Sequence, residues 1–245
     1  MCTGDDGIQF EDTGNYCFPG SAIVQTPQGP QRMDQLRIGD QVLTLAGFEP
    51  IFLFGGRDSR QLAPFIVIET GLHRIEMSAD HFIHVQSSGR QLFKRASQVS
   101  IGDMIWAEHE GALESTAVVG ISRAVQIGLF NPYTPSGTII VNDVLASVYS
   151  RWFLDDACDA LGCVACLPSI YQALMVPARF MSFLVTQIGG PGAVEAMDKS
   201  LSLTDLGHNY PKIAAASYAA GTSIVVFLTA ITFRKLASET MSWQS

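Results

Sequence analysis

The chain has 245 residues, enough for one or two domains with a sizeable hydrophobic core. Its formal net charge of -8 argues against nucleic acid as a partner, because phosphate binding needs clustered Lys and Arg. Charged residues make up only 16%, below the roughly 25% that is usual for a soluble protein, so we expect part of the chain to meet lipid.

Residues 1–16 are polar, with four acidic residues and no apolar stretch of the signal-peptide type. We interpret them as the end of an upstream segment, and we expect any secretory signal to lie upstream of Met1. The five cysteines (Cys2, Cys17, Cys158, Cys163 and Cys166) are odd in number and unevenly spread, so they do not predict a disulfide framework.

A thiol stands at the first sharp turn of the chain. Residues 17–21 read Cys-Phe-Pro-Gly-Ser and precede an apolar run at 22–24. Pro19 fixes one backbone angle and Gly20 frees the next, so the chain bends directly after Cys17. We predict that this thiol attacks the carbonyl carbon of Tyr16. The alternative is a buried, inert cysteine.

Short apolar runs continue from residue 21 to about residue 150 and predict an all-β domain. We expect strands at 22–26, 41–44, 50–54, 65–69, 81–86, 104–107, 117–121 and 138–141.

An internal repeat lies within this β domain. Residues 36–43 (LRIGDQVL) align with residues 99–106 (VSIGDMIW) at an offset of 63. Further upstream the matched residues are Ile23, Val24, Gln25 and Gly29 with Ile83, Val85, Gln86 and Gly89. Chance recurrence of Ile-Gly-Asp is the alternative. Two copies of one unit tend to pack about a pseudo-twofold axis, which would bring residues at matching places together.

Cys17 lies just before the first copy, and Ser78 and His81 lie just before the second. A neutral imidazole at His81 can take the thiol proton of Cys17 or give a proton to a departing backbone nitrogen. The Ser78 hydroxyl can hold the scissile peptide by a hydrogen bond. A single histidine or a single cysteine more often has a structural role. The internal repeat is the reason to place Cys17 and His81 in one site.

Four blocks carry a family resemblance. Residues 17–22 (CFPGSA), 36–43, 78–82 (SADHF) and 137–147 (GTIIVNDVLAS) resemble the Hint module of the Hedgehog C-terminal autoprocessing domain. The resemblance implies a Hint-type pseudo-twofold all-β domain at 17–150, followed by an α-helical tail at 151–245.

The resemblance also implies roles. Cys17 matches the nucleophile of an N-to-S acyl shift that makes a thioester with Tyr16, and His81 matches the histidine that assists by proton transfer. Ser78 stands where the family usually has Thr. The substrate would be the chain's own upstream segment, cut once in cis, with no metal or nucleotide cofactor.

Three departures from the family pattern stand out. Gly56 stands where the family has the acid that activates a sterol acceptor. Asp58, two residues later, is a candidate substitute, and a bulge in the strand would be needed to bring it to the same place. The cysteine after Ala-Ser is Val148, and the residue before the nucleophile is Tyr16 rather than Gly. The acceptor is therefore left open between water, a thiol and an alcohol or sterol.

Protein splicing is not expected, since Asn142 lacks the preceding His and the following Cys, Ser or Thr of an intein. Two further functions stay open: a cysteine peptidase acting in trans through Cys17 and His81, and a degenerate Hint module that serves as a membrane-tethered binding domain.

The tail after residue 150 predicts helices. Cys158, Cys163 and Cys166 fit burial, acylation at a membrane or, least well, zinc. Residues 163–188 carry one charge, and residues 213–233 carry none over a length that could cross a bilayer. We therefore expect contact with membrane lipid and a membrane-associated location in the secretory pathway or outside the cell, with a buried helix as the alternative.

Overall fold

Two similar units of hairpin, turn, hairpin and long strand follow one another along the first part of the chain. The computed structural model describes residues 18–87, 90–152 and 154–189. The first unit contains β1 (Ile23–Thr26), β2 (Gly29–Arg32), η1 (Met33–Gln35), β3 (Gln41–Thr44), β4 (Gly47–Pro50) and β5 (Leu53–Glu69). The second contains β6 (Arg74–Met77), β7 (Phe82–Ser87), β8 (Arg90–Arg95), η2 (Ala96–Gln98), β9 (Met104–His109), β10 (Ala112–Ala117) and β11 (Gly120–Tyr133).

The Ile-Gly-Asp turns of the two units have the same hydrogen bonds. Each aspartate carboxylate accepts a backbone N–H three residues before it, from Arg37 to Asp40 (2.8 Å) and from Ser100 to Asp103 (2.9 Å). The glycine before each aspartate has a positive φ, 95° and 91° respectively. Such φ values favour glycine, which explains why the tripeptide recurs. The repeat is therefore structural rather than a chance recurrence.

The two hairpins before these turns differ in length. β1 and β2 have four residues each, whereas β7 and β8 have six each. Ala22 accepts the N–H of Met33 just as His81 accepts the N–H of Ala96, both at 2.8 Å. Ala22 and His81 are therefore equivalent, and the upstream part of the sequence alignment, which matched Ile23 with Ile83, was wrong because the extra residues lie in the hairpin.

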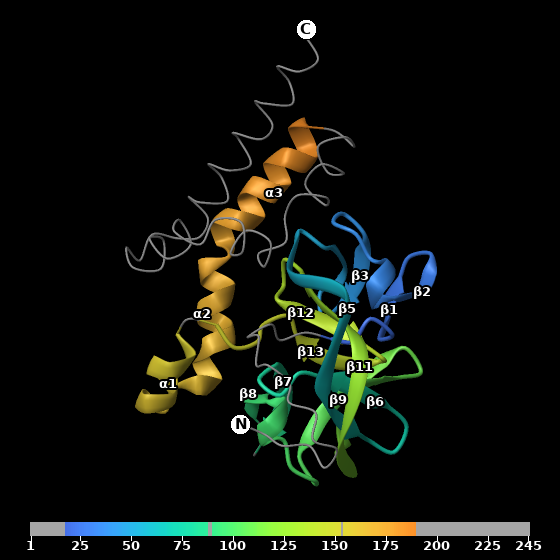
Figure 1. Cartoon of the computed structure of the whole chain (residues 1–245), viewed down its shortest axis with the longest axis vertical. Helices are drawn as coiled ribbons and strands as arrows, with labels where there is room; N and C mark the ends of the chain where they lie inside the picture. Colours follow the sequence, from blue (N-terminus) through green and yellow to red (C-terminus); the bar gives the residue numbers. More distant parts are fainter. Residues whose placement is uncertain (1–17, 88–89, 153, 190–245) are drawn as a thin grey trace, which may run out of the picture.

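The two units hold each other through their long strands. β5 and β11 pair antiparallel and lie side by side along the β domain (Figure 1). Met77, at the entry to the second unit, pairs with Ile66 of β5, in the first unit. Phe18, at the entry to the first unit, pairs with Phe130 of β11, in the second. Each entry is thus fixed by the long strand of the other unit.

The remaining strands close the main sheet. β12 (Thr138–Val141) and β13 (Val144–Ser147) form a hairpin between the units, in the order β10-β9-β7-β13-β12-β1-β2, with β8 on β7. Expected strands at 22–26, 41–44, 65–69, 81–86, 104–107 and 138–141 are confirmed, the 65–69 strand as part of the longer β5.

The strands expected at 50–54 and 117–121 are wrong. Both ranges contain a corner between a hairpin and a long strand, where Ile51 and Val118 are buried and donate their N–H groups to Asp40 and Asp103 (2.8 Å each). A short buried apolar run does not distinguish a corner from a strand, so the sequence pattern misled at equivalent places in both units.

Helices follow the β domain and lie to one side of it (Figure 1). They are α1 (Asp155–Leu161), η3 (Val164–Cys166), α2 (Leu167–Leu174) and α3 (Val176–Ile188). Tyr171 of α2 is fully buried, with its ring centroid 6.1 Å from that of Tyr149. Gln172 donates to the Pro135 carbonyl at 2.6 Å. The hydrophobic core therefore extends from the β domain into α2.

One helical stretch of the described residues, Val164–Gln187, is long and apolar enough to cross a membrane by length and composition. Its mean hydropathy is 1.2, and 29% of its apolar window is buried. The membrane helix expected at 213–233 lies outside the described residues.

The repeated turn predicts a cost for a side chain at Gly102. Gly102→Ala should lower the free energy of unfolding by roughly 1–2 kcal/mol, because alanine is strained at a φ of 91° although its methyl group would meet no atom within 4 Å. Gly71→Ala is the matched control, since Gly71 also has open space around it but has no positive φ. Urea denaturation of both variants measures the difference, and equal stabilities would contradict the prediction.

Candidate functional site

His81 is the buried centre of the site. It is fully buried at the start of β7, and its Nε2 lies 2.8 Å from the carbonyl oxygen of Ser147, the last residue of β13. A carbonyl oxygen only accepts, so Nε2 carries the proton, and in the neutral ring Nδ1 carries the lone pair. The structure therefore presents a buried imidazole whose Nδ1 can accept a proton.

Ser78 lies on the same turn as His81. Its carbonyl accepts the His81 N–H at 3.0 Å, which closes the turn. Its hydroxyl is buried and has no hydrogen-bond partner among the described residues. Burying a hydroxyl without a partner is costly, so a group outside the described residues is the expected partner.

Phe18 brings the start of the β domain to His81. The Phe18 and His81 ring centroids are 4.4 Å apart. The Phe18 backbone is held on both sides, donating to the Phe130 carbonyl at 2.9 Å and accepting from the Phe130 N–H at 3.0 Å. Cys17 and Tyr16 lie outside the described residues, so the placement of the predicted nucleophile stays a prediction.

A bulge lies beside this clamp. Phe130 pairs with Arg57 and Pro132 with Phe54, so the single residue Asn131 stands opposite the two glycines of β5, Gly55 and Gly56. Asn131 is buried, and its Oδ1 has no partner within the described part of the chain. No sequence motif marks this residue, because an Asn next to a Pro predicts a turn rather than a strand.

Asp58, the candidate substitute for the missing acid, is exposed. Its Oδ1 accepts the backbone N–H groups of Arg60 (2.8 Å) and Gln61 (3.1 Å). This carboxylate therefore stabilises a local turn of β5, where the pairing with β11 shifts register between Leu62 and Asp58. The role of Asp58 toward the acceptor stays a prediction. Val148 is fully buried in the core.

Asn142 has a structural role. Together with Asp143 it has a positive φ (48° and 63°) at the β12–β13 turn. Its Oδ1 accepts the Ile23 N–H at 2.8 Å, and its Nδ2 donates to the Arg74 carbonyl at 3.1 Å. The side chain thus connects the turn to both units.

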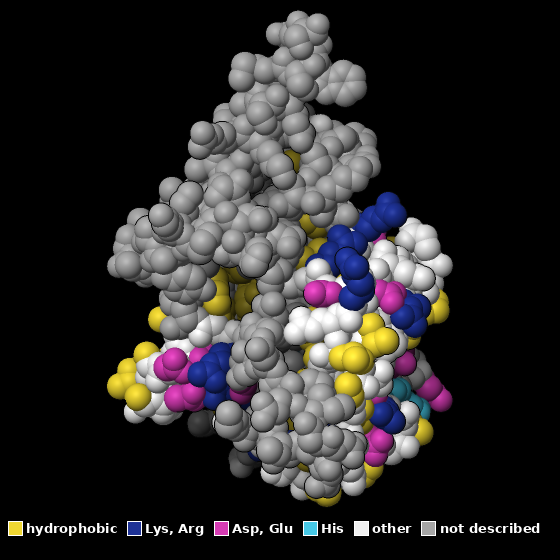
Figure 2. Space-filling view, viewed as in Figure 1, with side chains coloured by type: hydrophobic (Ala, Val, Ile, Leu, Met, Phe, Trp, Pro, Cys, Tyr) yellow, Lys and Arg dark blue, Asp and Glu magenta, His cyan; other side chains and the backbone are white. Residues whose placement is uncertain are grey.

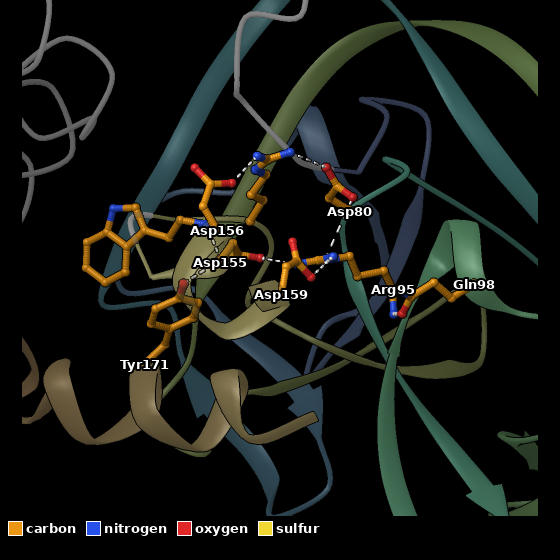
Figure 3. A network of polar contacts seen from close by, with 9 residues as sticks. Asp80, Arg95, Gln98, Asp155, Asp156, Asp159 and Tyr171 are labelled. Atoms are coloured by element: carbon orange, nitrogen blue, oxygen red, sulfur yellow. Dashed lines mark hydrogen bonds and ion pairs between the residues drawn. The ribbon is translucent and has the colours of Figure 1, made fainter. Parts of the chain in front are cut away.

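A network of charges anchors the turn that carries Ser78 and His81 (Figure 3). Asp80 lies between two arginines, with Arg95 Nε at 3.9 Å and Arg151 Nη1 at 3.7 Å. Arg95 also donates to Asp155 and Asp159 of α1, both at 2.8 Å. The partners of Arg95 outweigh its burial and raise its pKa, so it stays charged.

Asp155 is the buried end of this network. It is fully buried, and it accepts hydrogen bonds from Arg95, from the Trp152 N–H (2.7 Å) and from the Tyr171 hydroxyl. Oppositely charged side chains adjoin at the surface near α1 (Figure 2), where Arg151 pairs with the exposed Asp156. The first tail helix is thereby joined to the His81 turn.

The three tail cysteines differ in exposure. Cys158 is buried, Cys163 is partly exposed and Cys166 is exposed, and all three are free thiols. No group of three or more His, Cys, Asp or Glu that could hold a metal occurs in residues 18–87, 90–152 and 154–189.

Comparison with known proteins adds the family. A family model described as a Hint module matches residues 9–156. Warthog protein 6 of Caenorhabditis elegans is 31% identical over 151 residues, covering 58% of this chain and 26% of that protein. Sonic hedgehog protein of Danio rerio is 35% identical over 148 residues, covering 55% and 35%. The matched part thus spans about a third or less of these relatives.

Among solved structures, the crystal structure of gp41-1 intein is similar over 54% of this chain and 98% of its own, with a TM-score of 0.45 and 18% identity.

Removal of the Asp155 carboxylate should strongly destabilise the protein. Asp155→Ala leaves the guanidinium of Arg95, only 9% exposed, without its buried partner, and we expect a loss of about 3–5 kcal/mol. Asp156→Ala removes an 85% exposed carboxylate from the neighbouring position and should cost less than about 1 kcal/mol. Similar chemical denaturation midpoints for the two variants would contradict this.

His84 should make stability depend on pH. Burial lowers its pKa from 6.5 to about 4. The unfolded chain therefore takes up a proton as the pH falls below 6.5, whereas the folded chain does not until about 4, and stability falls across that window. The full shift corresponds to roughly 3 kcal/mol. The wild-type free energy of unfolding should fall relative to His84→Leu between pH 7 and pH 4, and a constant difference would refute this.

Proposed function

The chain belongs to the Hint module family, and from that premise we propose that it cleaves itself at the Tyr16–Cys17 peptide bond through a thioester. Autoprocessing is the general activity that this membership supports. Cys17 as nucleophile, His81 as acid and base, and Ser78 as hydrogen-bond donor are the specific proposal.

One observation carries this proposal: the residue bonded to Cys17 lies against the buried imidazole. Phe18 packs on His81 at 4.4 Å and is clamped to Phe130 through both of its backbone groups. Cys17 is covalently bonded to Phe18, and Phe18 contacts His81. We therefore expect the Cys17 thiol to reach the imidazole, which can accept its proton at Nδ1.

The first step exchanges an amide for a thioester. The Cys17 sulfur attacks the Tyr16 carbonyl carbon, a C–S bond forms and the C–N bond breaks. His81 takes the thiol proton and delivers it to the departing nitrogen, which becomes the α-amine of Cys17. The buried hydroxyl of Ser78, unpartnered within the described chain, is available to donate to the scissile carbonyl as negative charge develops on its oxygen.

The second step releases the upstream segment. A nucleophile attacks the thioester carbon, the C–S bond breaks and the Cys17 thiol forms again. Gly56 is buried where the resemblance expects the acid that activates a sterol, so a carboxylate at that position does not assist the acceptor here. We therefore favour water or another small nucleophile over a sterol.

We also propose that the tail meets membrane lipid. Val164–Gln187 has the length and composition to cross a bilayer, and Phe180 and Phe183 of α3 are 59% and 57% exposed. Large exposed aromatic side chains on one helix are typical of a surface that contacts lipid or a partner. A location in the secretory pathway or outside the cell stays a prediction.

The proposal is tested with the full chain carrying an upstream tag. Dithiothreitol should release the tag from the wild type, because a thiol exchanges with the thioester. Cys17→Ala should abolish release, His81→Ala should slow it by about 100-fold or more, and Ser78→Ala should slow it about tenfold. Gel electrophoresis with time measures all four proteins.

His84→Leu is the matched control, because it removes a second buried histidine from β7 and should leave release unchanged at neutral pH. A wild type that stays uncut with dithiothreitol would favour the degenerate binding module. Cys17-dependent cutting of an added peptide would favour a peptidase that acts in trans.

A further inference from the structure

We propose that Asn131 positions the hydroxyl group of the acceptor, water or a small alcohol, that resolves the thioester. This inference rests on the proposed autoprocessing and assigns a second part of the same site. Asn131 is a positioning residue of the acceptor step, distinct from His81 and Ser78, which serve the acyl shift.

The amide oxygen of Asn131 has an unused capacity to accept a hydrogen bond. The residue is only 4% exposed, and its Oδ1 has no partner within the described chain. An unsatisfied buried acceptor destabilises the folded state. A buried amide that is kept at such a cost indicates a donor that arrives with a ligand, and a hydroxyl group is such a donor.

The strand pairing brings this amide close to the start of the β domain. Phe18 and Phe130 exchange both backbone hydrogen bonds, so they form a hydrogen-bonded antiparallel pair. Asn131 directly follows Phe130 in β11, and Phe18 directly follows Cys17 in the sequence. The buried amide therefore lies one residue from the clamp that holds the residue bonded to the proposed nucleophile.

Gly55, opposite Asn131, makes room for its amide. A Cβ atom at Gly55 would lie 2.9 Å from Asn131 Nδ2 and 2.5 Å from Tyr133 Cε2, closer than atoms can approach. The amide therefore packs on bare backbone at the bulge, beside the buried Gly56. Where the resemblance expects an acid on β5, this chain has a glycine on β5 and an amide on β11.

An amide can orient a hydroxyl but cannot remove its proton at neutral pH. The acceptor O–H donates to Oδ1 while its oxygen attacks the Tyr16 carbonyl carbon. A C–O bond forms, the C–S bond breaks, and the hydroxyl proton ends on the Cys17 thiolate. Water yields a carboxylic acid on the released segment, and an alcohol yields an ester. No oxidant, metal or further reactant is needed.

The test separates the acceptor step from the thioester step. The tagged full chain is incubated in buffer without thiol, with and without ethylene glycol, and separately in dithiothreitol. Asn131→Leu, which keeps the volume but removes the amide, should slow thiol-free release by about tenfold or more and leave dithiothreitol release within about twofold of the wild type. Mass spectrometry of the tag distinguishes acid from ester.

Asn131→Asp is the matched variant of the same shape. Its carboxylate accepts the same hydrogen bond and can also take the proton, so thiol-free release should return at least to the wild-type rate. The rate should also rise with pH as the carboxylate ionises, whereas the amide cannot confer this dependence. A merely structural role would not produce such a profile.

Three outcomes contradict the inference. Equal thiol-free rates for wild type and Asn131→Leu, with normal dithiothreitol release, would overturn it and leave the autoprocessing intact. A parallel loss in both assays would show that Asn131 serves the fold or the acyl shift. A wild type that releases the tag in neither condition would refute the proposed function itself, and this inference with it.

Discussion

A two-residue clamp determines where the site can be. Phe18 and Phe130 exchange backbone hydrogen bonds at 2.9 and 3.0 Å, and this pairing fixes the entry of the chain on a strand that comes more than a hundred residues later. The clamp places the Phe18 ring on the buried His81. Asn131 directly follows Phe130 and lies at the bulge that β11 forms against β5. Without these hydrogen bonds, Phe18 would not be held against the His81 ring.

Hydrogen bonding then specifies the chemistry of the imidazole. Ser147 offers only a carbonyl to His81, which assigns the proton to Nε2 and the lone pair to Nδ1. Asp80, one residue before His81, is held between Arg95 and Arg151. The same arginines bind α1, so the turn that positions the imidazole is supported from the tail as well as from the sheet.

Much of the β domain could be predicted from sequence, because its strands are short apolar runs separated by turn residues. The Ile-Gly-Asp repeat was predictable since a glycine with positive φ and an aspartate that accepts a nearby N–H are both required by the turn. The corners at Ile51 and Val118 were not, because burial in a corner and in a strand gives the same apolar signal.

The site was only partly predictable. Ser78 and His81 carry recognisable chemistry, and their shared turn follows from their spacing. Asn131 has no motif, and its burial depends on a bulge between strands some 70 residues apart in sequence, which local patterns do not encode. The network of Arg95 and Asp155 likewise joins residues distant in the chain, and charged residues of this kind are read from sequence as exposed.

The reciprocal pairing of entries and long strands bears on the origin of the architecture. Met77, at the start of the second unit, pairs with β5 of the first unit, and Phe18, at the start of the first unit, pairs with β11 of the second. Neither unit therefore pairs the backbone of its own first residues. A single unduplicated unit would meet the same requirement only by exchanging arms with an identical chain. The ancestor implied by this arrangement is a domain-swapped homodimer, and gene fusion would have made that exchange intramolecular.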